Sequence, residues 1–269
     1  MEQQAIARSA VAYLRARPGV RRVRFDEADG CSSDALAAWH AAHAPRRLPD
    51  DLQAFLGVAN GVRLTWDFAW GDEEEGLGAP PPGASGGAAG VAARSVAVPV
   101  GCARVNALEA MVPVQLDAWP EDDPGGWMEG APPGPPAAAV GGEVAAFCLD
   151  GGCTCGRVAL VYGAQIPKAS ASKHKGKGKS AASASAVEPS VWFVDLGCQW
   201  NFIAASFGDY FRLMISHLGL PHWQYAFTEW GLDPVAQQWL RYLAPERLAL
   251  ITKERKRRKK KGQRKARRP

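Results

Sequence analysis

Apolar residues recur at helical spacing in several stretches of this chain. The clearest stretch has four of them, which fall three or four positions apart and so share one helical face: Leu52, Phe55, Leu56 and Ala59. Pro49 and the acids of 50–51 precede them, and both residue types are favoured in a first helical turn. Asn60-Gly61 is expected to end this helix, because both residues tolerate a left-handed backbone.

The same spacing predicts further helices over 3–16, 35–43, 203–218, 221–230 and 234–242. Pro18-Gly19 is expected to stop the first, and Ser32 or Ser33 to cap the second. Asp233-Pro234 combines an N-cap with a proline at the first helical position. Pro245 is expected to end the folded part of the chain.

Runs rich in β-branched and aromatic residues predict strands over 20–25, 62–70, 95–105, 143–149, 157–162 and 191–194. The first is expected to be a short edge strand. The last is apolar on both faces, as suits a central strand. The strands 143–149 and 157–162 form a predicted hairpin, because the glycine-rich residues 150–156 join them.

Three segments consist mostly of small, Gly, Pro or charged residues: 71–94, 120–142 and 166–188. Such segments cannot bury enough apolar surface to offset their ordering entropy, so we expect disordered loops. They would interrupt a single domain over 1–245. Helices, an antiparallel meander and further helices follow one another along the chain. This order predicts an α+β fold with helices on one face of the sheet.

The basic residues are concentrated at one end of the 269-residue chain. Of 32 Lys and Arg, twelve lie in 253–269, together with one Glu. The first 252 residues hold 20 basic and 26 acidic side chains and so form an acidic body. Such asymmetry indicates partners of opposite charge rather than a particular fold.

Residues 246–269 are predicted to be a disordered basic tail that attracts polyanions in a salt-dependent way. Nuclear import or RNA binding uses the same residue types, although no aromatics are interleaved here for stacking bases. A solvated tail without a dedicated partner is the third interpretation. The candidate polyanion-binding residues are Lys253, Arg255, Lys256, Arg257, Arg258, Lys259, Lys260, Lys261, Arg264, Lys265, Arg267 and Arg268.

No set of residues in the chain predicts catalysis, a cofactor or a metal. The closest candidate is Cys153-Thr154-Cys155 beside Cys148, but structural zinc usually needs C-x₂₋₄-C pairs, and the nearest histidine is His174 in a predicted loop. Ordinary thiols are therefore expected. The N-terminus lacks the apolar core of a signal peptide. No run of 18 apolar residues predicts a membrane span, so a reducing compartment is expected.

Aromatic residues are dense near the end of the predicted fold: Trp223, Tyr225, Phe227, Trp230, Trp239 and Tyr242. Aromatics at this density either close a core or form an interface. Trp223, Phe227 and Trp230 would share one face of a helix, which favours a core, while Tyr225 is available for a partner. The candidate interface residues are Trp223, Tyr225, Trp230 and Trp239.

Two segments resemble known families. Residues 48–56 with Asn60-Gly61 are similar to the helix-and-turn signature of the SUKH superfamily. Residues 209–227, which read DYFRLMISHLGLPHWQYAF, resemble the family of tubulin polyglutamylase complex subunit 2. Residues 64–66, 191–195 and 199–202 fit that family too. The resemblance extends over about 5–243 and leaves out the predicted loops and the basic tail.

The resemblance implies a SUKH-like fold and a non-catalytic scaffold or targeting subunit. Its complex adds glutamate chains to tubulin C-terminal tails, with catalysis in a tubulin tyrosine ligase-like partner. Other polyglutamylase subunits and microtubules are the further implied partners. The implied location is the cytoplasm and cytoskeleton, at microtubules and the cilium, basal body or centrosome region. The alternatives are a nucleic-acid-associated protein, a general SUKH-type interaction module and, last, an enzyme in its own right.

Overall fold

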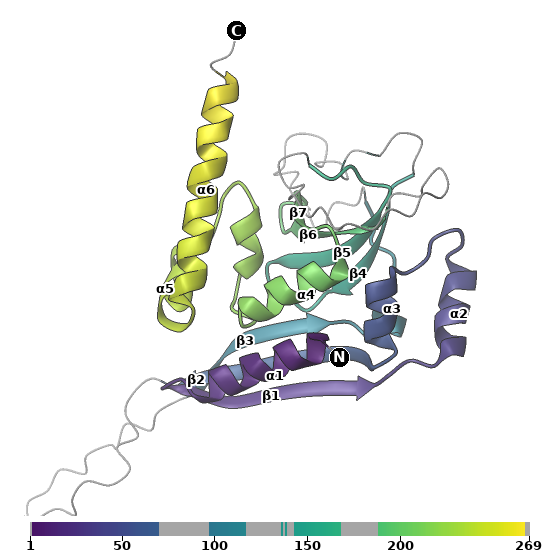
Figure 1. Cartoon of the computed structure of the whole chain (residues 1–269), viewed down its shortest axis with the longest axis horizontal. Helices are drawn as coiled ribbons and strands as arrows, with labels where there is room; N and C mark the ends of the chain where they lie inside the picture. The colour runs from purple at the N-terminus through teal and green to yellow at the C-terminus, as the bar shows by residue number, and fades with distance from the viewer. Residues whose placement is uncertain are drawn as a thin grey trace, which may run out of the picture.

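The computed structural model describes residues 2–69, 97–116, 136, 138, 143–167 and 188–266. The predicted loops 71–94, 120–142 and 166–188 lie almost wholly outside these residues. Within them the chain is α+β, as expected, but its strands form two antiparallel sheets instead of one (Figure 1).

The first sheet has the order β1 (Val20–Asp29), β2 (Ala59–Ala69) and β3 (Ala97–Val105). β1 is an edge strand, as predicted, although it is longer. Trp66 on β2 is fully buried, and its indole N–H donates to the carbonyl of Leu218 at 2.8 Å. This contact needs a residue without a side chain beside it: a Cβ on Gly101 of β3 would lie 1.8 Å from the indole nitrogen of Trp66.

The prediction that Asn60-Gly61 ends a helix is wrong. The helix α3 (Asp50–Leu56) stops earlier, and both residues belong to β2. The Asn60 side chain accepts from the backbone N–H of Leu108 at 2.7 Å. Gly61 has a φ of +91° and lies so close to Ala107 that a Cβ would be 2.8 Å from its nitrogen. These residues therefore hold the strand against the chain that follows β3.

The second sheet has the order β4 (Ala145–Asp150), β5 (Gly156–Tyr162), β6 (Ser190–Asp195) and β7 (Trp200–Ala204). The predicted hairpin is confirmed as β4–β5, and β6 is internal, as expected. β7 was not predicted: the sequence assigned Ile203 to a helix, whereas it lies in a strand that pairs with β6.

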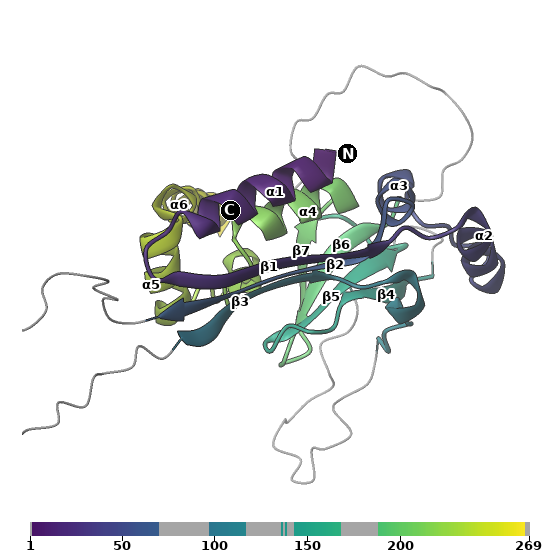
Figure 2. The ribbon, with the colours of Figure 1, turned by 90° about the horizontal axis from the view of Figure 1, so that it is seen from below.

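Helix α1 (Glu2–Arg15) lies along β1 of the first sheet, and α4 (Phe207–Ser216) lies beside α1 and contacts β6 and β7 of the second sheet (Figure 2). At one end of the molecule are α2 (Ser33–Ala42) and α3, and at the other α5 (Pro234–Leu243). The expected caps are present: Ser32 accepts from the N–H of Ala35, and Asp233 from that of Ala236. One buried hydrophobic cluster joins both sheets to these helices.

Two C-terminal predictions are corrected. The expected helix over 221–230 is only a 3₁₀ turn, η2 (Trp223–Phe227), and His222 before it has a left-handed backbone with φ 60°, which keeps that residue out of a helix. The expected disordered tail is instead α6, a 22-residue helix (Pro245–Ala266) that extends away from the body (Figure 1). Pro245 begins this helix, and Lys and Arg, which fill most of its later turns, are good helix formers.

Candidate interaction site at the C-terminal helix

The first turns of α6 are fixed to the body through a buried histidine on α4's C-cap. The guanidinium of Arg247 donates to Nε2 of His217 at 3.2 Å, and Nδ1 of His217 donates to the carbonyl of Leu213 at 2.6 Å. His217 is fully buried and stacks on Trp223, with 4.7 Å between ring centroids. Burial, and secondarily the charge of Arg247, lower the pKa of His217 to about 3. This imidazole is therefore neutral and serves as a hydrogen-bonded anchor.

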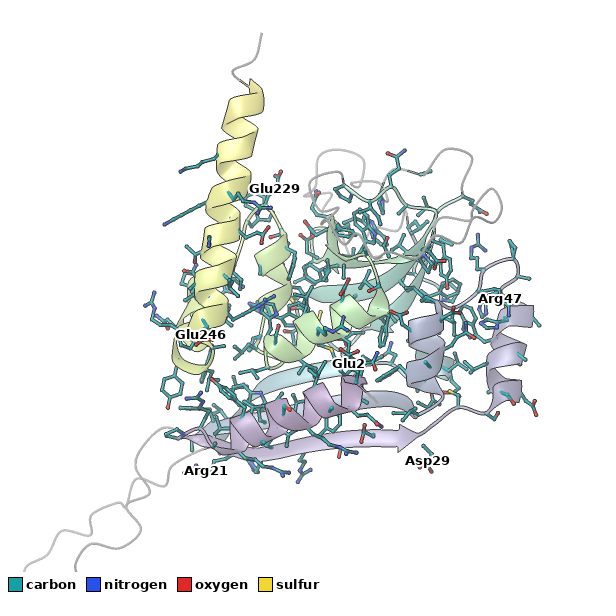
Figure 3. All side chains as sticks on the ribbon, in the orientation of Figure 1. Glu2, Arg21, Asp29, Arg47, Glu229 and Glu246 are labelled. Atoms are coloured by element: carbon teal, nitrogen blue, oxygen red, sulfur yellow. The ribbon has the colours of Figure 1, made fainter. Side chains whose placement is uncertain are left out.

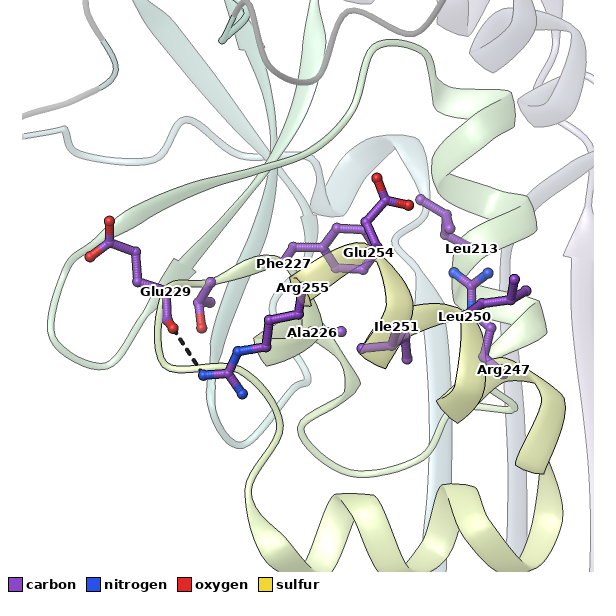
Figure 4. A pocket seen from close by; sticks show the side chains of 10 residues that line it. Leu213, Ala226, Phe227, Glu229, Arg247, Leu250, Ile251, Glu254 and Arg255 are labelled. Atoms are coloured by element: carbon purple, nitrogen blue, oxygen red, sulfur yellow. Dashed lines mark hydrogen bonds between the residues drawn. The ribbon is translucent and has the colours of Figure 1, made fainter. Parts of the chain in front are cut away.

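One face of α6 lines a cavity of about 620 Å³ against α4 and η2, here called the Phe227 groove (Figure 4). Apolar side chains make part of its wall, among them Leu213, Phe227 and Ile251. Arg255 crosses one end of it and donates to the carbonyls of Glu229 at 3.3 Å and Trp230 at 2.5 Å. Figure 3 shows Glu229 beside the middle of α6. Arg255, a candidate polyanion-binding residue, thus ties α6 to the body.

Another face of α6 meets α5 in a shallow groove of about 510 Å³, here called the Lys256 groove. Its lining is Arg241, Pro245, Leu248, Ala249, Thr252, Lys253 and Lys256. The three cations are exposed, and none of them has an ion pair among the described residues. Positive charge therefore surrounds a partly apolar floor.

The remaining candidate cations extend beyond this groove. Lys260 is exposed on the same helix, and exposed Arg257 lies 3.8 Å from the carboxylate of Glu254. The side chains of Arg258, Lys259, Lys261, Arg264 and Lys265, and all of Arg267 and Arg268, lie outside the described part of the structure. Arg241 was not among the predicted residues, because it belongs to α5 and only tertiary packing brings it beside α6.

The four aromatic interface candidates lie in different environments. Trp223 is only 2% exposed and belongs to the core, so the interface prediction for it is corrected. Tyr225 is partly buried against Phe193, and Trp239 packs edge-on against Trp66. Trp230 is 76% exposed, because the expected helix ends before it. The core prediction thus holds for Trp223 and fails for Trp230.

The thiols of Cys153 and Cys155 lie 3.8 Å apart in the turn between β4 and β5. Cys153 donates to the carbonyl of Gly156 at 3.0 Å. The neighbouring Cys155 thiol and burial raise the pKa of Cys153. The cysteines of the chain are free thiols. In the described ranges, His, Cys, Asp and Glu nowhere gather in a group of three that could hold a metal.

Other buried ionisable groups hold turns in place. Asp150, whose pKa is raised by burial, accepts from the N–H of Gly152 at 2.8 Å. Asp195 accepts from Gly197 at 3.0 Å and Gln199 at 2.9 Å, and so shapes the turn into β7. None of the helices in the described ranges combines the length and apolarity that crossing a bilayer requires.

Comparison with known proteins places this chain among named relatives. It is 27% identical over 243 residues to human "Tubulin polyglutamylase complex subunit 2", a match that covers 86% of this chain and 67% of that protein. The rat and mouse proteins of the same name are 44% identical over 71 residues, which cover 26% of this chain and 24% of each of them. No family model and no solved structure matches.

The SUKH-like fold therefore stays a prediction. The resemblance to the polyglutamylase subunit is confirmed: this chain is a homologue of proteins named tubulin polyglutamylase complex subunit 2.

Proposed function

We propose that this chain is a non-catalytic scaffold and targeting subunit of a tubulin polyglutamylase complex, which supports glutamate-chain addition to tubulin C-terminal tails. The observation that carries the proposal is the cationic helix α6, which extends from an acidic body. Membership of this complex is inferred from the names of the homologues. The buried ionisable groups His217, Asp150 and Asp195 make structural hydrogen bonds to the backbone, as is expected of a subunit without a catalytic role.

In this proposal the body docks on other subunits of the complex, including a tubulin tyrosine ligase-like subunit that performs catalysis. Exposed Trp230 is suited to such a contact, since tryptophan is enriched among the residues that dominate protein interfaces. Location at microtubules, in the cilium, basal body or centrosome region of the cytoplasm, is part of the same proposal.

Helix α6 would meanwhile hold the complex near the acidic microtubule surface. A single exposed charge pair contributes about 1 kcal/mol or less. Many such pairs on one element raise the local concentration of the attached complex without a large fixed interface. Because exposed charges are screened over about 8–10 Å at physiological salt, the attraction should fall as salt rises.

The test is removal of residues 253–269 from the full chain. This cut retains Arg247, Leu248 and Ile251, which fix the first turns of α6. We expect weaker co-sedimentation with microtubules at low salt, and unchanged co-purification of the other subunits. A second variant, with Lys256, Arg257 and Lys260 changed to Gln, keeps the Arg255 contacts and should show the same loss.

Unchanged microtubule affinity in both variants would contradict the targeting role, and loss of the other subunits would contradict the division between body and helix. The pull-down is repeated after nuclease treatment. Tubulin and the catalytic subunit should persist, whereas partners that vanish with RNA would favour a nucleic-acid-associated protein.

A further inference from the structure

The Lys256 groove is formed by two helices that are consecutive in sequence. Arg241 comes from the last turn of α5, while Lys253 and Lys256 come from the third and fourth turns of α6. The floor between them is provided by Pro245, Leu248 and Ala249. Acidic residues are missing from the lining that the structure describes. Cations thus flank a short apolar strip.

The side chains of the groove that are free to bind a ligand are all hydrogen-bond donors. The hydroxyl of Thr252 already donates to the carbonyl of Leu248 at 2.8 Å. The remaining polar side chains are Lys and Arg, which can only donate hydrogen bonds. Since none of them has an ion pair among the described residues, the groove offers donors and positive charge and selects an anionic ligand.

The spacing of the charges fits an extended peptide. Residues three apart on a helix, such as Lys253 and Lys256, lie about 5–6 Å from each other. Alternate side chains of an extended chain are about 6.6 Å apart, so two carboxylates at i and i+2 could reach these two lysines. An apolar side chain of the same peptide would then cover Leu248 and Ala249, which a simple inorganic anion could not do.

We propose that the Lys256 groove is a binding site for an acidic peptide segment rich in glutamate with an adjoining apolar residue. This inference rests on the proposed function and deepens it, because it places the recognition of acidic protein tails at a defined groove between α5 and α6. It differs from diffuse attraction in one respect: Arg241, which precedes the basic tail, takes part in the site.

The experiment compares matched single variants of the full chain. Lys256→Gln and Arg257→Gln remove the same charge from adjacent exposed positions of α6, but only Lys256 lines the groove. Arg241→Gln tests the cation of α5, and exposed Arg63→Gln on β2 is its control. The probe is a fluorescein-labelled peptide of eight glutamates with a central leucine, measured by fluorescence anisotropy at low salt.

We expect Lys256→Gln and Arg241→Gln each to raise the dissociation constant of the peptide about threefold. The two controls, Arg257→Gln and Arg63→Gln, should each raise it by less than about 1.5-fold. A peptide with serine in place of the leucine should bind less tightly to the unaltered chain. Ala249→Glu, which adds a charge to the groove floor, should abolish the difference between the two peptides.

Equal losses for Lys256→Gln and Arg257→Gln, with none for Arg241→Gln, would overturn the groove in favour of diffuse attraction. Tighter binding of a single-stranded RNA oligonucleotide, or of vesicles with anionic lipid, through the same residues would also overturn it. Co-purification of the other polyglutamylase subunits is measured for every variant. If the unaltered chain does not co-purify with those subunits, the proposed function is rejected. Whether the groove binds an acidic peptide is decided by the anisotropy measurements alone.

Discussion

At the scale of single residues, His217 shows how a titratable group can be structural. Both of its ring nitrogens are engaged inside the body, one by the Leu213 carbonyl and one by the Arg247 guanidinium. A proton on Nε2 would remove an acceptor and place a second positive charge beside Arg247. The fold therefore opposes protonation of this ring, and its pKa is lowered to about 3 from an ordinary value near 6.5.

This pKa makes folding depend on pH in a defined direction. Below about pH 6.5 the unfolded chain binds a proton at His217 and the folded chain does not, so the contribution of this site to stability falls as pH decreases toward 3. Between pH 7.5 and 5 we expect a loss of about 2 kcal/mol from this group. Urea titrations at the two pH values measure it.

The control variant is His217→Asn, whose amide can still donate to the Leu213 carbonyl but does not titrate. It should be less stable at pH 7.5 and should lose about 2 kcal/mol less than the unaltered chain on going to pH 5. Buried Asp150, whose pKa is raised, acts in the opposite direction in both proteins and cancels in the comparison. Equal losses in the two proteins would contradict the buried neutral histidine.

At the scale of elements, local signals predicted well what local interactions determine. Ser32 and Asp233 cap their helices within three residues in sequence, so their side chains could be recognised from spacing alone. Asn60 and Gly61 have the same local propensities as a helix end, but their contacts are to the chain after β3, some 48 positions away. No local pattern contains that information.

Two missed elements did carry signals. Asp195 accepts from Gly197 and Gln199, so the Asp-x-Gly pattern marks the turn that leads into β7. In α6, a proline at the first position is followed by Leu248 and Ile251, which are three residues apart, and this pattern is typical of the start of a helix. The many charged residues that follow had instead suggested a disordered tail. The cations of the site could be seen in the sequence, but the groove could not, because tertiary packing brings Arg241 to α6.

The stability of α6 is expected to depend on its first turns. Like charges at i and i+4 oppose helix formation beyond Lys253. The part of α6 from Lys253 to Ala266 is also short, and isolated helices of fewer than about 12–15 residues are marginal in water. Ile251 packs against the core, whereas its neighbour Leu250 is 57% exposed. Ile251→Ala should therefore increase hydrogen exchange along α6 by about tenfold, which corresponds to about 1.4 kcal/mol.

Leu250→Ala is the matched control, since it removes a side chain of similar size from the same turn and should leave exchange nearly unchanged. The measurement is mass-spectrometric hydrogen exchange on a peptic peptide from α6. If the two variants behave alike, the packing of Ile251 does not hold the helix, and the charged turns are stable by themselves.

At the scale of the whole molecule, opposite charges are kept apart. The first 252 residues carry an excess of acids, whereas residues 253–269, most of which lie on a helix that extends outward from the body, hold twelve basic residues and one Glu. An acidic body would repel an acidic filament, so attraction is confined to one end and the rest of the surface is left for other contacts. Trp230 lies near this boundary, held through its carbonyl by Arg255.

Assembly with the other subunits and association with microtubules should therefore be separable by substitution. Trp230→Ala removes a side chain that is 76% exposed, so the folded chain should keep its thermal midpoint within about 1–2 °C. If the side chain fills a pocket on another subunit, its loss should weaken co-purification of that subunit by tenfold or more, as for central tryptophans of interfaces. Microtubule co-sedimentation of the isolated chain should not change.

The matched control is Leu196→Ala, which removes a similarly exposed apolar side chain from the turn between β6 and β7. It should affect neither measurement. The Lys256, Arg257 and Lys260 triple variant should show the converse of Trp230→Ala, with assembly kept and microtubule association reduced. If Trp230→Ala reduced both measurements together, the body and the helix would act as one surface, because the contacts through Arg255 would then couple the partner site to the cationic face.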